Sequence, residues 1–487
     1  MRPVALGLPY DEMKEIVASA TKWSFFSELV PRLVPACTYI LLIRILVPED
    51  FGIVAVAVMI VGLSKVLTDA GLSKALIRHQ EDPSSAASTV FWTNAVLGIA
   101  VYGVCFAAAD GIATLFNDVR IGSVVKVQGI QILFSAMFSV HVALFQKHLD
   151  FRKLFWIRLA GSGIPSVISL VFAYIGYGYW ALVIGSVIGS FFEMVLLWWL
   201  CAWRMKFIFE LDLLRTLFKD GWWITLETFL GWAFAWVDLA IVARFLDIHT
   251  TGVYRTGGMI VMLLFAVLIG PVLPVLFSWF SRIQDERDRL NWVLTESTKL
   301  LSMIAFPSGC ILWMLSDYVE ILFLDAEWQG VGAVIGYVGL AYGISYAVAA
   351  NNEAYRAIGR ADIATKLLLF SFIYYLPVYL LTVSQGLELF LMARVILACS
   401  GAFLHIYVCS LVTGLNLIEL FVALRGTALA VAAMLASMAL VKFLFDGAAT
   451  TLWEPAVIGS TGALAYILMQ YKEWDSVKET VYSVIRA

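Results

Sequence analysis

The feature that most constrains this chain is the regular recurrence of apolar runs about 20 residues long. Hydrophobic residues make up 61% of the 487 residues and charged residues only 14%, whereas soluble domains carry about 25% charged residues. A run of about 20 apolar residues is long enough to cross the hydrocarbon core of a bilayer as a helix. The sequence therefore predicts an all-α polytopic membrane protein.

Fourteen such runs can be marked along the chain. We expect transmembrane helices at about 22–46, 53–76, 86–108, 121–143, 156–176, 179–201, 216–243, 253–280, 292–315, 330–350, 364–384, 388–411, 424–444 and 452–471. Because the number of spans is even, both termini are expected on the same side of the membrane. No removable signal peptide is expected at the N-terminus, which lacks a basic region followed by a short apolar core.

The basic residues indicate which side the termini occupy. Of the 33 Lys and Arg residues, 24 lie on the side of the termini, and Arg32 and Lys65 lie inside predicted spans. The seven on the opposite side are Arg44, Arg120, Lys126, Arg244, Arg255, Arg394 and Lys442. By the positive-inside rule, this asymmetry predicts that both termini are cytoplasmic.

Four charged residues lie within the first two predicted spans. Glu28 and Arg32 are four residues apart on the first span, and Lys65 and Asp69 have the same spacing on the second. Residues four apart share one face of a helix, and the rise of a helix places the four charges at similar depths. A charge near the bilayer centre costs about 2.5–3.5 kcal/mol, so these residues are predicted to line a polar cavity. The alternative is two self-neutralising pairs that only hold the helices together.

An internal repeat links the two halves of the chain at an offset of 200 residues. The matched residues are Trp23 and Trp223, Arg44 and Arg244, Leu46 and Leu246, and Gly52 and Gly252. Six spans separate the copies, so both have the same orientation, and repeats of this kind are typical of transporters whose substrate site lies between the halves. We predict an N-terminal lobe at 1–201, a cytoplasmic connector at 202–219, a C-terminal lobe at 220–411, and two extra spans with a cytoplasmic tail at 412–487.

The second half carries its own charged candidates. Glu227 and Asp238 lie eleven residues apart on the seventh span, about three helical turns. Together with Arg255 at the outer start of the eighth span, they are expected to form a second charged face of the cavity. Glu193 and Arg394 stand alone in their spans and are expected to be peripheral.

Several prolines lie inside predicted spans, where each removes a backbone hydrogen bond and kinks the helix. Pro31 and Pro35 in the first span and Pro271 and Pro274 in the eighth are the hinge candidates. A static kink is the alternative at each position.

Two further groups of residues lie at span ends. Arg44 and Arg244, at matched outer positions, either bind an anion or extend to lipid head groups. Asn352, Glu353 and Arg356 end the tenth span on the cytoplasmic side, where they form either a gate or a helix cap.

The sequence carries no recognisable catalytic, metal or nucleotide motif. It has no phosphate-binding Walker loop, no His-Glu-x-x-His and no Gly-x-Ser-x-Gly, and its six cysteines show no Cys-x-x-Cys spacing. We therefore expect no enzyme activity and no cofactor or metal. No basic tail indicates nucleic acid as a partner. Transport would be driven by an ion gradient, the membrane potential or the gradient of the substrate.

Three segments resemble the bacterial polysaccharide transporter family, which contains lipopolysaccharide and exopolysaccharide flippases of the multidrug/oligosaccharidyl-lipid/polysaccharide exporter superfamily. They are Ile43-Arg-Ile-Leu-Val-Pro-Glu-Asp-Phe-Gly-Ile-Val-Ala55, Thr68-Asp-Ala-Gly-Leu-Ser-Lys-Ala-Leu-Ile-Arg78 and Ser88-Thr-Val-Phe-Trp-Thr-Asn94. The resemblance implies two pseudo-symmetric six-helix lobes around a central cationic cavity, with two further C-terminal helices. It also implies a location in the bacterial inner membrane.

The same resemblance implies the activity. Members of the family flip an undecaprenyl-pyrophosphate-linked oligosaccharide from the cytoplasmic to the periplasmic leaflet, so a polysaccharide polymerase, a chain-length regulator and membrane lipid are implied partners. Basic residues on spans one, two and eight engage the pyrophosphate in related flippases, and Arg32, Lys65 and Arg255 occupy broadly matching positions. Two alternatives remain open: an ion-coupled multidrug or cation antiporter that uses the acidic residues, and a membrane polymerase or ligase of lipid-linked sugars.

Overall fold

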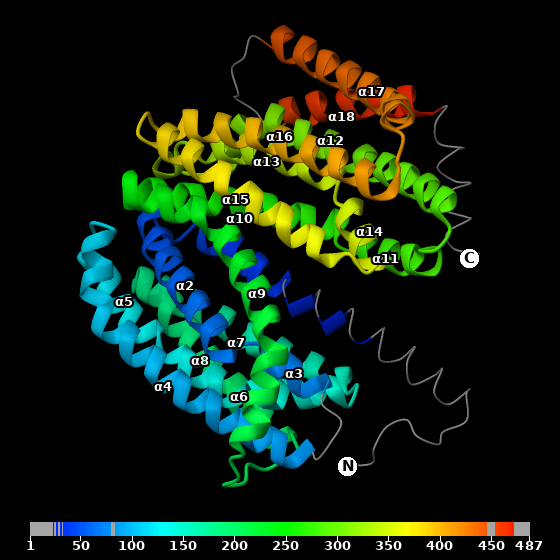
Figure 1. The fold of residues 1–487 in the computed structure, drawn as a ribbon. Coiled ribbons are helices and arrows are strands. Elements are labelled where there is room, and N and C mark those ends of the chain that lie inside the picture. Colours follow the sequence, from blue (N-terminus) through cyan, green and yellow to red (C-terminus); the bar gives the residue numbers. More distant parts are fainter. Residues whose placement is uncertain are drawn as a thin grey trace. The chain divides into compact units, whose positions relative to one another are not determined.

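The structure is a computed structural model that describes residues 23, 26–27, 30–31, 33–78, 83–445 and 453–471. These residues form helices and loops without a β-strand (Figure 1). The chain forms two compact units, Met1–Gly252 and Val253–Ala487. The predicted all-α architecture is thus confirmed, whereas the lobe and connector limits drawn from the sequence stay predictions.

In the described part of the first unit, eight helices follow residue 47. They are α2 (Pro48–Asp69), α3 (Leu72–Arg78), α4 (Pro83–Leu115), α5 (Val119–Gln128), α6 (Ile130–Lys147), α7 (Phe151–Ile175), α8 (Tyr179–Leu200) and α9 (Leu211–Phe245). A shorter apolar helix, Leu33–Leu42, precedes them. Helices α5 and α6 follow one another so closely that together they make one span, Val119–Lys147.

The remaining helices belong to the second unit, except that α10 begins just before the boundary. They are α10 (Ile248–Ile269), α11 (Val272–Arg282), α12 (Arg287–Phe323), α13 (Val331–Ala347), α14 (Ala350–Ala357), α15 (Ala361–Val383), α16 (Leu387–Thr413), α17 (Leu417–Leu444) and α18 (Trp453–Gln470), with a short 3₁₀ turn, η1 (Ala326–Trp328).

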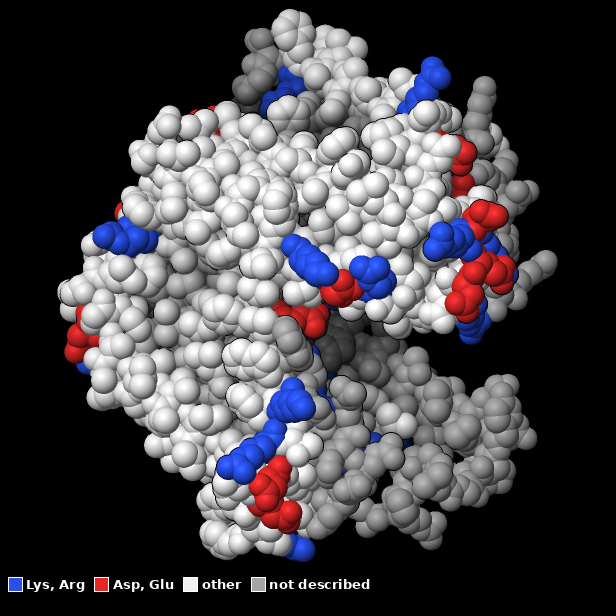
Figure 2. Space-filling model, in the orientation of Figure 1, with Lys and Arg blue, Asp and Glu red and all other residues white. Residues whose placement is uncertain are grey.

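The membrane-spanning character of the helices is visible on their surfaces. In the part of the chain that the structure describes, 12 spans are long and apolar enough to cross a membrane, and each matches one of the fourteen predicted runs. The fourteenth run coincides with α18, and much of the first lies outside the described residues. Large apolar side chains such as Val104 and Phe443 are mostly exposed, and Figure 2 shows broad areas of the face in view without charged residues.

The repeat seen in the sequence also governs helix limits. Helix α2 runs from Pro48 to Asp69 and α10 from Ile248 to Ile269, so both ends are 200 residues apart. The next helices, α3 and α11, begin at Leu72 and Val272, again 200 residues apart. The two copies therefore share a break after the first helix as well as its length.

This shared break corrects two predictions. The runs 53–76 and 253–280 were expected to be single spans, but each is divided between two helices. In the first copy Ala70 and Gly71 have positive φ values of 45° and 70°, which end a right-handed helix. In the second copy Pro271 follows Gly270 and has no backbone N–H to continue the helix. Different residues thus produce the same break.

Close helix contacts in the second unit depend on glycine. Helices α12 and α13 pack side by side along their length. A Cβ on Gly309 would lie 2.6 Å from the carbonyl oxygen of Gly339, and one on Gly343 would lie 2.8 Å from that of Ala305. Small residues let helix backbones approach within a membrane, where packing rather than the hydrophobic effect drives association. These glycines therefore hold the pair together.

Candidate functional site

One face of α2 carries polar side chains in the middle of a membrane-spanning helix. Ser64 and Thr68 are buried, and their hydroxyls donate to the carbonyl oxygens of Ile60 and Ser64, at 2.9 and 2.8 Å. A hydroxyl that bonds to its own helix one turn back needs no other partner in the membrane. The Lys65 ammonium has no carbonyl of its own helix as a partner in the described structure and bonds to another helix.

Lys65 reaches across to α6. Its Nζ donates to Oε1 of Gln131 at 3.4 Å. The buried Gln131 donates through Nε2 to Ser186 Oγ at 3.0 Å and accepts from Ser190 Oγ at 3.2 Å. The amide therefore links the cation on α2 to two hydroxyls on α8. We call Lys65, Gln131, Ser186 and Ser190 the polar network.

Glu193 lies one turn beyond Ser190 on the same helix. It interacts electrostatically with Lys65 and with Arg158 of α7, and a Cβ on Gly161 would lie 3.2 Å from its Cδ. The absence of a side chain at Gly161 makes room for the carboxylate between α7 and α8. The expectation that Glu193 is isolated is therefore wrong.

Asp69 has a different environment from Lys65. Its Oδ1 accepts a short hydrogen bond from the hydroxyl of Ser73 in α3, across the break between the helices. Lys65 and Asp69, although four residues apart, have partners other than each other. Glu28 and Arg32, the predicted partners on the first span, lie outside the described residues.

The outer end of α2 is fixed by a carboxylate. Asp50 is buried and accepts from the backbone N–H of Val47 at 3.3 Å and of Tyr179 at 2.8 Å. The first bond caps α2 in the manner of the back-reaching half of a capping box, and the second ties the start of α8 to it.

The second copy of the repeat caps its helix with a carboxylate at another position. Asp247, which matches Val47, accepts from the N–H and the hydroxyl of Thr250, each at 2.8 Å. Although partial burial opposes the shift, the hydrogen bonds from Thr250 lower the pKa of the Asp247 carboxyl. The acid has moved from the third helical position to the cap, and both arrangements satisfy free N–H groups at a helix start.

The remaining charged candidates of the second half do not form one cluster in the described structure of either unit. Asp238 on α9 is buried and accepts from the N–H of Leu239 at 2.7 Å, whereas Glu227 on the same helix is exposed. Arg255 is partly buried in α10. Arg394 of α16 donates to the Tyr254 hydroxyl, and its guanidinium lies 5.8 Å from the Tyr254 ring. The expectation that Arg394 stands alone is therefore wrong too.

The span-end candidates show two patterns. Arg44 and Arg244 are both exposed at the ends of matched helices, and the Arg244 guanidinium lies 5.7 Å from the Phe245 ring. Glu353 and Arg356 form an ion pair of 3.2 Å within α14, next to Asn352. The anion site at Arg44 and Arg244 and the gate at Asn352, Glu353 and Arg356 stay predictions.

The hinge candidates likewise remain predictions. Pro31 and Pro35 lie in helical backbone. Pro271 is the residue before α11, and Pro274 lies in the first turn of that helix. The pair therefore lies at the break between α10 and α11 rather than inside one helix.

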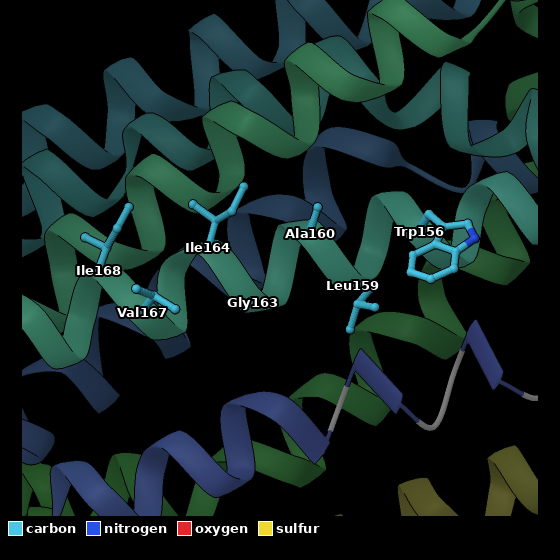
Figure 3. A pocket seen from close by; sticks show the side chains of 7 residues that line it. All are labelled: Trp156, Leu159, Ala160, Gly163, Ile164, Val167 and Ile168. Carbon is cyan, nitrogen blue, oxygen red and sulfur yellow. The ribbon is translucent and has the colours of Figure 1, made fainter.

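Cavities with largely apolar linings lie on the described part of the first unit. One, of about 520 Å³, follows α7 and is lined by residues of this helix alone, including Trp156, Gly163 and Ile168 (Figure 3). The other, of about 610 Å³, lies at the end of α8, where His141 stacks on Trp198 with ring centroids 5.5 Å apart. Among the described residues, no group of three or more His, Cys, Asp or Glu side chains could hold a metal ion.

Comparison with known protein families decides the class of the chain. The model of a family described as polysaccharide biosynthesis protein matches residues 41–332, which is more than half of the chain. The chain belongs to this polysaccharide biosynthesis family. The match contains α2, α6, α7 and α8, and thus the whole polar network, and it confirms the resemblance found in the sequence.

Curated relatives of this polysaccharide biosynthesis protein are distant. The succinoglycan biosynthesis transport protein ExoT of Rhizobium meliloti is 23% identical over 66% of this chain and 65% of its own length, just under two thirds. The lipopolysaccharide biosynthesis protein WzxC of Escherichia coli is 22% identical over 75% of each chain. Both names belong to polysaccharide biosynthesis, and the first is that of a transport protein.

Solved structures show the fold of this family member more fully. The lipid II flippase MurJ, in an inward closed conformation, matches with a TM-score of 0.74 and 14% identity over 92% of this chain and 99% of its own. An inward-facing multidrug resistance MATE transporter of the MOP superfamily matches with a TM-score of 0.63 and 15% identity, over 80% and 98%. At these identities the likeness establishes the two-lobed transporter fold and nothing finer.

Sequence reasoning missed most of the polar network in this family member. Gln131 carries no charge and lies 66 residues beyond Lys65, so nothing local connects them. A signal was nevertheless present on α8, because Ser186, Ser190 and Glu193 follow the spacing of one helical face. A polar stripe in an otherwise apolar span indicates a buried network.

Proposed function

We propose that this protein is a flippase that moves an oligosaccharide linked to a polyprenyl diphosphate from the cytoplasmic to the outer leaflet of the bacterial inner membrane. The observation that carries the proposal is its membership of the polysaccharide biosynthesis family, in a chain that shares the fold of a lipid flippase over 92% of its length. The names of the relatives, which concern succinoglycan and lipopolysaccharide, support a surface polysaccharide as the final product.

The charged part of such a substrate calls for cations within the membrane. Lys65 supplies an ammonium in a membrane-spanning helix, and among the described residues it is held by one long hydrogen bond to a neutral amide. A diphosphate would form shorter, charge-assisted hydrogen bonds with it. Arg32 of the first span and Arg255 of α10 are further candidate contacts of the diphosphate. The acids Glu28, Asp69, Glu227 and Asp238 would complete the lining.

The lipid part calls for an apolar surface. The cavity along α7 offers one, since its lining residues are apolar and lie on a membrane-spanning helix. An isoprenoid chain would lie along it while the diphosphate is held within the protein. The sugars need a polar space. In transporters built from parallel repeats, this space lies between two lobes and opens alternately to each side of the membrane.

The proposed flippase also has an expected orientation, partner proteins and a driving force. Both termini are proposed to be cytoplasmic. A polymerase and a chain-length regulator would use the flipped oligosaccharide, and an ion gradient or the membrane potential would drive the cycle.

A second candidate function is the export of small cations or drugs coupled to an ion. The fold likeness to the MATE transporter favours it, as do the carboxylates of Glu193 and Asp238 in membrane-spanning helices. A deletion strain that becomes drug-sensitive while its surface polysaccharide is unchanged would select this candidate.

The proposal is tested in the native organism by replacing the chromosomal copy. Lys65→Ala, and separately Arg32→Ala, should abolish surface polysaccharide while the protein remains in the membrane at its usual level. Asp212→Asn is the matched control, because Asp212 is exposed in α9 and pairs with Arg215 at the surface. Normal polymer in the Lys65→Ala strain would contradict the proposal.

A further inference from the structure

The charges around Lys65 do not balance among the described residues. One acid, Glu193, faces two cations, Lys65 from α2 and Arg158 from α7, while α6 contributes the neutral amide of Gln131. Each ionised group in a low-dielectric interior is costly unless compensated. With all three ionised, the cluster carries one net positive charge, and with Glu193 protonated it carries two.

Lys65 is held by one long hydrogen bond in the described structure. Its bond to Gln131 is long at 3.4 Å, and the Gln131 amide is engaged by Ser186 and Ser190 on its other side. Glu193 attracts Lys65 without a direct bond to it in the described structure. Part of the attraction on the ammonium therefore acts through space, and this part disappears when the carboxylate is neutral.

Arg158 connects this cluster of charges to the first span. Arg158 donates through Nη1 to the carbonyl oxygen of Ser27 at 3.4 Å. Gly161, one turn after Arg158 on α7, provides the space that Glu193 occupies. The carboxylate thus lies at a junction of three helices that each carry a charged or polar group, and a change of its charge acts on all of them.

We propose that Glu193 is a proton-binding site whose occupancy determines whether the Lys65 ammonium is available to a diphosphate group. Protonation of the carboxylate removes the negative charge that compensates Lys65 among the described residues, so an anionic substrate binds more tightly. By linkage, a bound diphosphate raises the affinity of Glu193 for a proton by the same factor. Proton and diphosphate would then favour each other's binding, and the inference rests on the flippase proposed above.

The test uses the purified full-length protein and geranylgeranyl diphosphate as the probe. Isothermal titration calorimetry between pH 6 and pH 8, in buffers of different ionisation enthalpy, gives both affinity and the number of protons taken up. Acidification also removes charge from the probe, and this effect is common to all variants. Relative to Glu193→Gln, we expect the wild type to gain about tenfold in affinity on acidification, within the usual range of coupling between sites, and to take up one more proton.

Three variants interpret the result. Glu193→Gln should bind at pH 8 as tightly as the wild type does when Glu193 is protonated. Lys65→Met should lose most binding at every pH, and Asp212→Asn should behave as the wild type. Tight binding by the wild type with the same proton uptake in Glu193→Gln would overturn the inference and leave the flippase standing. Failure of the wild type to bind at any pH would overturn both.

Discussion

Gly52 on α2 and Gly252 on α10 lie face to face, and a Cβ on either would stand 3.1 Å from the amide nitrogen of the other. The same Cβ atoms would collide with backbone oxygens, that of Ile248 for Gly52 and that of Pro48 for Gly252. Gly52 and Gly252 are 200 residues apart, and so are Pro48 and Ile248, so the contact is symmetric under the repeat. The two helix starts can approach this closely because neither carries a side chain at the crossing.

Gly52→Ala should therefore separate the two helices. The colliding atom belongs to the backbone and cannot rotate away, so we expect a loss of about 1–3 kcal/mol in stability, as in other overpacked sites. Thermal unfolding of the detergent-purified protein measures it. Gly103→Ala on α4 is the matched control, because nothing lies within 4 Å of its Cβ. Equal melting temperatures for the two variants would contradict the crossing.

Asp50→Ala should loosen the start of α2 and its bond to α8. The substitution leaves the backbone N–H groups of Val47 and Tyr179 without their acceptor, at a cost of about 1–3 kcal/mol for buried groups. Hydrogen exchange should increase at Tyr179 and through the loop before it. Glu49→Ala serves as the control, and equal exchange in both variants would count against the assigned role.

Asp247 should give pH-dependent stability with a defined sign. Because its folded-state pKa is lowered, its contribution is present above the unfolded pKa of about 4 and is lost as pH falls through the lower folded value. The free energy of unfolding of the wild type should exceed that of Asp247→Ala by about 1 kcal/mol at pH 7, as for other helix caps. This difference should become smaller toward pH 3. A gap that widens on acidification would refute the cap.

The sequence allowed the helices to be predicted because a membrane span is a local property. Runs of apolar residues set the spans, whereas the side of the membrane that the Lys and Arg distribution indicates stays a prediction. The breaks at 70–71 and 270–271 were missed because they depend on backbone conformation. Ala70 adopts a φ of 45°, which its methyl side chain does not signal.

The candidate site was less predictable because its contacts are distant in sequence. Lys65 was identified from its charge alone, but its partners Gln131 and Glu193 are placed by the packing of α2, α6 and α8. Asp69 followed the opposite course, since its partner Ser73 is four residues away. Charges in a span can be listed from sequence, whereas the direction in which each side chain turns is a tertiary property.

The intramembrane Lys65 is proposed to serve the passage of a polyprenyl-diphosphate-linked sugar across the bilayer. The direct measurement is a flipping assay in proteoliposomes, with a fluorescent lipid-linked sugar in the outer leaflet quenched by membrane-impermeant dithionite. Wild-type protein and Asp212→Asn should make the inner-leaflet pool accessible to the quencher, and Lys65→Ala should not. Equal accessibility with Lys65→Ala and with the wild type, or none with the wild type, would contradict the claim.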